Sequence, residues 1–133
     1  MLLQPLHTWY FSATAYGSGS YFAKFSWYSA QKLYAQPNKD GVQFVFQTRV
    51  LTGDYCKGQH EHKVAPFKDK TKTQQYDSVV NDMKNPYIYV VFSDDAAYPD
   101  YIVKFVKWKL FNLIANHEIS LTADSRFYFY AII

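Results

Sequence analysis

The chain has 133 residues, of which 49% are hydrophobic and 20% aromatic, and its formal net charge at pH 7 is +3. This length suits one domain with a real core, and so small and dispersed a charge argues against direct nucleic-acid binding. No apolar run of about 18 residues occurs, so no transmembrane helix or membrane partner is expected. The only cysteine, Cys56, excludes an intrachain disulfide and favours a reducing compartment, and the uncharged, interrupted start does not fit a signal peptide.

The first part of the chain predicts a glycine turn, a short strand and a helix. Gly17 and Gly19 permit a tight turn, and residues 20–25 alternate as in a short strand. Ser26 is a good N-cap for a helix. The helical spacing is marked by Trp27, Ala30, Leu33 and Tyr34. A Pro-Asn-Lys-Asp-Gly turn at residues 37–41 ends this helix.

Residues 42–51 are the clearest strand in the sequence. One face carries Val42, Phe44, Phe46, Thr48 and Val50. The other face is mixed and carries Gln43, Val45, Gln47, Arg49 and Leu51. Residues 55–86 are then expected to form a long polar loop, which in a compact domain is usually functional or disordered.

Two further strands are predicted, at residues 87–92 and 98–106. The first is a near-continuous apolar run that suits a central strand, and the second alternates. Asp94 and Asp95 lie between them and are interpreted as turn residues, because neighbours on an extended chain point in opposite directions and do not converge on one substrate.

Isolated motifs carry little chemistry. The Gly-x-Gly turn is no dinucleotide fingerprint, because Phe22 stands at the third glycine position and a strand follows. Cys56, His60 and His62 are zinc-type ligands, but no fourth ligand lies at a suitable spacing, so a polar loop is favoured and no metal is predicted.

The turn, strand and helix present two aromatic rings, Tyr21 and Tyr34, with the hydroxyl of Ser29 between them in sequence. Core packing explains two tyrosines equally well when they are taken alone. Two flat faces and one small hydrogen-bonding group also suit the edge of a pocket for a flat ligand.

Several segments, in order and with suitable spacing, carry a resemblance to a known family. They cover residues 16–23, 28–30 with Tyr34, 49–55, 76–79 and 97–105. Together they resemble the catalytic domain of the poly(ADP-ribose) polymerase (PARP) family, most of all its macrodomain-carrying, mono-ADP-ribosylating members. The resemblance implies an α+β, antiparallel-sheet-dominated, ADP-ribosyltransferase-like fold.

The resemblance also implies a site for the nicotinamide end of NAD⁺. Tyr21 corresponds to the tyrosine that packs against the nicotinamide ring, and Tyr34 to the one that stacks on the other face. Ser29 corresponds to the serine that hydrogen-bonds the carboxamide, and Gly17 and Gly19 form the turn beside it.

Two departures from the family pattern stand out. No His-Gly pair precedes Ala15, and His7 is followed by Thr8, so the family's catalytic histidine is not assigned to His7. The resemblance implies a catalytic His-Tyr-Glu triad, for which Tyr21 is expected to be a catalytic residue. The third position of the triad, a glutamate in the polymerases, falls on Ile88, which resembles the mono-ADP-ribosylating members.

The resemblance divides the chain into three parts. Residues 1–12 are expected to be an atypical lead-in, residues 13–106 a catalytic domain that lacks its N-terminal part, and residues 107–133 an atypical extension. Within the extension, residues 108–114 fit a helix or a strand. Residues 127–133 are β-prone and would favour aggregation if left unpaired.

Two functions remain open. The first is transfer of one ADP-ribose unit from NAD⁺ to an acceptor protein, with release of nicotinamide and without a metal. The second is an inactive module that binds NAD⁺ weakly or binds another protein. The expected location is intracellular, in the nucleus, the cytoplasm or both.

Overall fold

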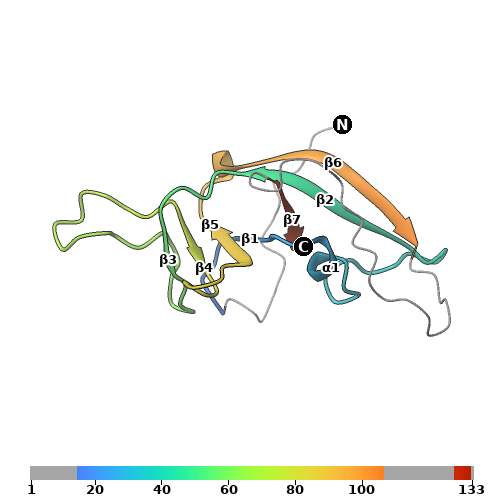
Figure 1. Ribbon diagram of the computed structural model, residues 1–133, viewed down its shortest axis with the longest axis horizontal. Coiled ribbons are helices and arrows are strands. Elements are labelled where there is room, and N and C mark those ends of the chain that lie inside the picture. Colours follow the sequence, from blue (N-terminus) through green and yellow to red (C-terminus); the bar gives the residue numbers. More distant parts are fainter. Residues whose placement is uncertain (1–14, 107–127, 133) are drawn as a thin grey trace.

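The computed structural model describes residues 15–106 and 128–132. They form a seven-stranded sheet in the order β3-β4-β5-β1-β7-β2-β6 (Figure 1). The strands are β1 Ser20–Ala23, β2 Val42–Val50, β3 Tyr55–Lys57, β4 Ser78–Val80, β5 Ile88–Val91, β6 Ala97–Val106 and β7 Tyr128–Ile132. All neighbours pair antiparallel except β3 and β4, which are parallel. The expectation of a fold dominated by an antiparallel sheet is confirmed.

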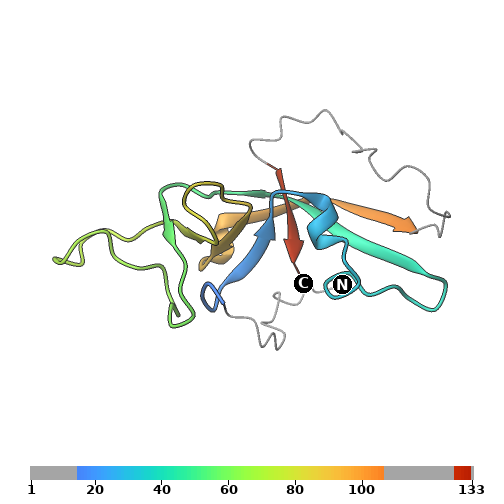
Figure 2. The same cartoon turned by 60° about the horizontal axis from the view of Figure 1, so that its bottom comes forward.

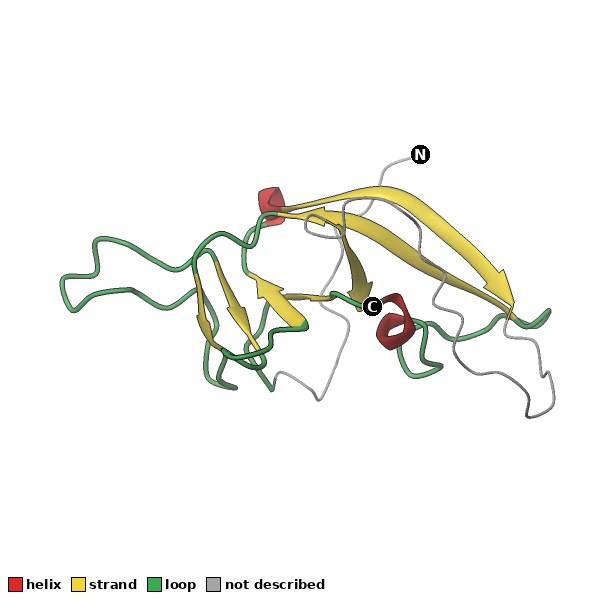
Figure 3. Cartoon of the chain, in the orientation of Figure 1, coloured by secondary structure: helices red, strands yellow, loops and turns green. Residues whose placement is uncertain are grey.

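Helical structure is limited in the described residues to α1, Ser26–Ser29, and the 3₁₀ helix η1, Asp94–Ala96 (Figure 3). In the same residues, no helix is both long and apolar enough to cross a membrane.

The main cluster of buried hydrophobic residues lies on one face of the sheet. It contains Phe22, Val50, Val80, Tyr89, Val91 and Phe129. The register agrees with this, because Phe22 lies opposite Tyr89 on β5 and residues directly opposite one another share a face.

The other face, called here the α1 face, carries Tyr21 and Ala23 of β1. Ala23 lies opposite Ile88 of β5 on one side and opposite Tyr130 of β7 on the other. Gln47 of β2 is also opposite Tyr130. Helix α1 contacts β1 and β7 and lies beside β7 in both views (Figures 1 and 2).

Burial changes sides along β2. The strand alternates as predicted, but Gln43, Val45 and Gln47 are buried on the α1 face, while Phe44 on the apolar face is 45% exposed. Only near the end of the strand does the apolar face meet the core, through Val50. At Gln43 the reason is tertiary, because its side chain contacts the segment that follows α1.

The predicted helix is wrong in length and in its cap. It stops at Ser29, its N-cap is Phe25 rather than Ser26, and no side chain caps it. The periodic residues do not form its buried side: Trp27 and Leu33 are 62% and 63% exposed, respectively. A single helical turn has little stability of its own, so tertiary contacts decide which side chains are buried.

The prediction of one loop over residues 55–86 is also wrong in part. Short strands β3 and β4 lie within it, and Ser78, Val79 and Val80 of β4 are buried against β5. Between them the chain extends away from the sheet (Figure 1). Three-residue strands have too little periodicity to be seen in the sequence.

The other strand predictions hold, with small changes at their ends. Strand β5 is buried throughout, as expected of a central strand, and β6 is a long edge strand. The expected turn at Asp94 and Asp95 is the helix η1.

Strand β7 gives the β-prone end of the chain a place in the sheet. It pairs with both β1 and β2, so its described residues are not left unpaired. The predicted lead-in at residues 1–12 and the ambiguous segment at residues 108–114 lie outside the described residues.

Candidate functional site

The glycine turn is packed tightly against β5. Gly17 has a φ of +129°, and a Cβ at Gly19 would lie 2.4 Å from the carbonyl oxygen of Val91. The Tyr21 hydroxyl donates a hydrogen bond to the Gly17 carbonyl (2.7 Å) and accepts one from the Tyr16 amide (3.1 Å). Burial is the main cause that raises the pKa of Tyr21. Turn and tyrosine therefore form one fixed unit.

The loop with the possible zinc ligands packs against this turn. The Ser18 amide donates a hydrogen bond to the His62 carbonyl (2.8 Å). The Nδ1 atom of His62 accepts one from the Gln59 amide (3.3 Å). Burial raises the pKa of Cys56, which disfavours the thiolate that a metal or a nucleophilic role needs. Within the described ranges, no three His, Cys, Asp or Glu side chains form a metal-binding group.

Ser29, at the end of α1, is only 1% exposed. Its hydroxyl donates a hydrogen bond to the carbonyl oxygen of Tyr130 in β7 (3.1 Å). A hydroxyl has one hydrogen and two lone pairs, so this oxygen can still accept a hydrogen bond from an amide N–H.

Tyr34 lies in the turns after α1 and stacks on Tyr28. Their ring centroids are 5.4 Å apart at an interplanar angle of 21°, and their hydroxyl oxygens are 3.2 Å apart. Tyr28 also meets Tyr87 edge to face, at 5.9 Å. Burial, followed by the hydrogen bond with Tyr34, raises the pKa of Tyr28 to about 12.

Ile88 begins β5 and is 4% exposed. The side-chain oxygen of Asn81, also buried, accepts hydrogen bonds from the amides of Tyr87 (3.1 Å) and Ile88 (2.9 Å). The residues alone did not point to Asn81, because an asparagine in a polar stretch is read as part of a turn.

Gln43 is the second residue that sequence reasoning missed. It is 1% exposed, and its side-chain amide donates hydrogen bonds to the carbonyl oxygens of Ala30 (3.3 Å) and Ala35. The only signal in the sequence was a glutamine within an otherwise strong strand. The signal is weak, since a polar residue on one face of an alternating strand usually indicates that this face is exposed to solvent.

The structure brings most of the predicted site residues to one face. The strand register places Tyr21 and Ile88 on the α1 face. Ser29 donates a hydrogen bond to Tyr130 of β7, the strand that lies between β1 and β2. Tyr34 belongs to a second group of contacts, centred on Tyr28. Gly17 and Gly19 support Tyr21.

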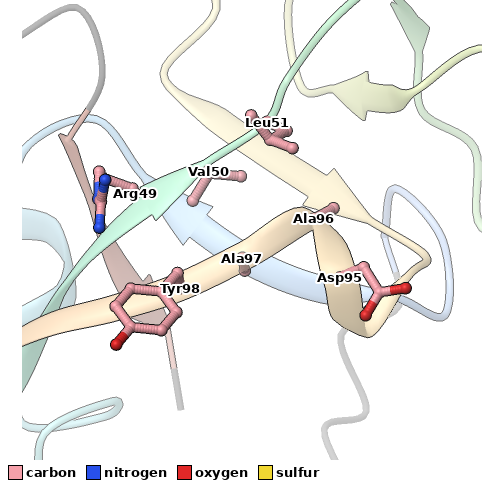
Figure 4. A pocket seen from close by; sticks show the side chains of 7 residues that line it. All are labelled: Arg49, Val50, Leu51, Asp95, Ala96, Ala97 and Tyr98. Carbon is pink, nitrogen blue, oxygen red and sulfur yellow. The ribbon is translucent and has the colours of Figure 1, made fainter.

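A separate hollow of about 510 Å³ lies where β2 ends beside η1 and β6 (Figure 4). It is lined by Arg49, Val50, Leu51, Asp95, Ala96, Ala97 and Tyr98. Arg49 forms an ion pair with Asp100 at 2.6 Å. None of the residues predicted to hold nicotinamide lines this hollow.

The sheet-dominated fold is that of an ADP-ribosyltransferase-like domain. Three relatives agree. The chain is 41% identical over 97 residues to human protein mono-ADP-ribosyltransferase PARP14, 38% over 92 residues to mouse PARP10, and 33% over 108 residues to mouse PARP11. The chain therefore belongs to the PARP family, next to its mono-ADP-ribosyltransferases.

These matches cover 72%, 69% and 68% of the chain, but only 5%, 10% and 32% of the respective relatives. No protein-family model matches the chain.

Proposed function

We propose that this chain is part of an NAD⁺-dependent protein mono-ADP-ribosyltransferase that binds nicotinamide on the α1 face. The observation that carries the proposal is the convergence of Tyr21, Ser29 and Ile88 on that face, in a chain whose relatives are named mono-ADP-ribosyltransferases. Tyr21 and Ile88 lie in two paired strands, β1 and β5, so the sheet fixes their positions relative to each other.

Each residue has a physical role in this proposal. The ring of Tyr21 offers a flat, partly buried surface for the nicotinamide ring, and Tyr34 offers a second one. The Ser29 oxygen accepts a hydrogen bond from the carboxamide N–H, since its own hydrogen goes to Tyr130. Stacking and one directed hydrogen bond together set the orientation of the nicotinamide end.

The proposed reaction breaks the bond between the ribose anomeric carbon and the nicotinamide nitrogen. The electron pair of that bond leaves with nicotinamide, which becomes neutral. An oxygen of an ionised acceptor carboxylate then bonds to the anomeric carbon. A carboxylate has no proton to lose, so the absence of an acid or base at Ile88 does not block a single transfer. The protein acts mainly by positioning.

Ile88 supports transfer of one unit over polymer growth. Growth requires a sugar hydroxyl as acceptor, and that hydroxyl must lose a proton. The Ile88 side chain is a buried hydrocarbon with no group that accepts it.

The test is incubation of the purified chain with labelled NAD⁺ and a glutamate-rich acceptor peptide, with Tyr21→Ala as the matched negative control. The expected result is one label per acceptor site, lost in the control. No transfer and no thermal shift with NAD⁺ or nicotinamide would contradict the enzymatic proposal. A ladder of labels would contradict the assignment of Ile88.

A second candidate is an inactive module that binds NAD⁺ weakly or binds another protein. The observation that favours it is that no His-Gly pair occurs among the 133 residues of this chain. A thermal shift with NAD⁺ but no label transfer would support this candidate.

The location and partners follow from the same proposal. An enzyme that uses NAD⁺ and acceptor proteins is expected inside the cell, in the nucleus or cytoplasm, and the single cysteine is compatible with this. Fluorescence microscopy of the tagged chain tests the location.

A further inference from the structure

We infer that Gln43 is a positioning residue that holds the segment carrying Tyr34, residues 30–35, over the α1 face. The inference rests on the proposed function, because it gives Tyr34 a ligand to bind. It concerns a residue of β2 that lies outside every motif on which the family resemblance depends.

The segment after α1 has little structure of its own. Helix α1 has only four residues, and turns follow it. Within the segment, the amides of Tyr34 and Ala35 both donate hydrogen bonds to the Gln31 carbonyl at 2.9 Å. A single turn of this kind is marginal in water, so a contact from outside must fix its position.

Gln43 supplies that contact at two points. Its side-chain nitrogen donates hydrogen bonds to the carbonyls of Ala30 and Ala35, the two ends of the segment. Both hydrogens of the amide are thereby used, as a side chain 1% exposed requires. Tyr34 lies directly before Ala35, so its backbone is held next to an anchored carbonyl.

Strand β2 is a suitable support. Gln43 lies opposite Phe105 in the long β2–β6 pairing. Its side chain shares the α1 face with Gln47, which lies opposite Tyr130. The face of the sheet that carries Tyr21 therefore also holds the segment with Tyr34 in position.

The test compares Gln43→Met with Thr48→Val. Methionine keeps the length and apolar stem of glutamine but donates no hydrogen bond. Thr48 is an equally buried polar residue of β2, on the opposite face of the strand. Both variants lose a buried polar group, but only the first releases residues 30–35.

Two measurements distinguish a local release of residues 30–35 from a general loss of stability. In Gln43→Met, hydrogen exchange at the Tyr34 and Ala35 amides should quicken by about tenfold relative to the amides of β5. Affinity for nicotinamide, measured by calorimetry, should fall by about tenfold. Thr48→Val should change neither. If Gln43→Met does not fold, Gln43→Asn replaces it. Asparagine keeps the amide but is shorter by one methylene, so it should change exchange and affinity in the same direction as Gln43→Met, by a smaller factor.

A double-mutant cycle shows whether Gln43 acts through Tyr34. In a Tyr34→Ala background, Gln43→Met should have no further effect on nicotinamide affinity, whereas two losses that multiply would overturn the inference. The two possible failures are distinguishable, because exchange needs no ligand. Nicotinamide that does not bind the unmodified chain overturns the proposed function. Unchanged exchange at Tyr34 and Ala35 overturns the role of Gln43 alone.

Discussion

The two sides of the candidate site are built in different ways. The Tyr21 side consists of a glycine turn and a strand of the sheet, in which backbone lies against backbone. The Tyr34 side is a single helical turn followed by turns, held by the side chains of Gln43, Ser29 and Tyr28. The first is fixed by close steric fit, and the second by a few separate hydrogen bonds.

This difference has a consequence for mutations. A bulkier residue in the turn forces the backbone of β1 and β5 apart, so the effect should be large and should spread. Removing one hydrogen bond on the Tyr34 side should lower the free energy of unfolding by only about 1 kcal/mol and leave the sheet intact. Substitutions at buried and exposed positions test this contrast.

Gly19→Ala should have the largest effect. A Cβ at this position would lie 2.4 Å from the Val91 carbonyl oxygen and 2.8 Å from a methyl group of Val90. We expect the free energy of unfolding to fall by about 3 kcal/mol, measured by urea denaturation. Gly41→Ala is the control: nothing lies within 4 Å there, and its φ of +76° alone predicts a loss of about 1 kcal/mol. Equal losses would contradict the close-fit account.

Asn81→Ala should come next. Its side chain accepts hydrogen bonds from the partly buried amide of Tyr87 and the buried amide of Ile88, so we expect a loss of about 2 kcal/mol in urea denaturation. Asn38 also accepts from two amides, those of Asp40 and Val42, but at an exposed site where water can replace it. Asn38→Ala should therefore change stability by less than half as much.

Ser29→Ala should have a smaller effect, a loss of about 1 kcal/mol, because it leaves the Tyr130 carbonyl without the serine hydrogen. Ser26→Ala is the control, since Ser26 is exposed and caps nothing. Its change should stay within about 0.5 kcal/mol. A loss at Ser26 equal to that at Ser29 would show that the helix, not the contact with β7, matters.

The smallest effect should appear only at high pH. The pKa of Tyr28 is raised from 10.0 in the reference state to about 12 in the fold. The folded state therefore holds this proton more tightly, so the stabilisation is complete below pH 10 and is lost as pH rises toward 12. The urea midpoints of the unmodified chain and Tyr28→Phe should converge between about pH 10 and 12. Midpoints that keep a constant separation would contradict this coupling.

The principal strands could be predicted from the sequence because each carries a signal of its own, either an alternation or a continuous apolar run. The alternation of β2 and β6 and the apolar run of β5 were sufficient. Strands β3 and β4 were missed because three residues hold no period, and their burial comes from neighbours in the sheet. The length of α1 was overestimated because Trp27 and Leu33 follow a helical spacing but face solvent.

The sequence by itself determined the glycine turn, the principal strands and the family, because each depends on residue types at short spacings along the chain. Only the tertiary structure decided that β7 lies between β1 and β2, that Ser29 bonds to Tyr130, and that Gln43 faces the segment carrying Tyr34. The Ser29–Tyr130 contact joins residues 101 positions apart. No local pattern encodes such a pairing, since it depends on strand order and on which face of the sheet is covered.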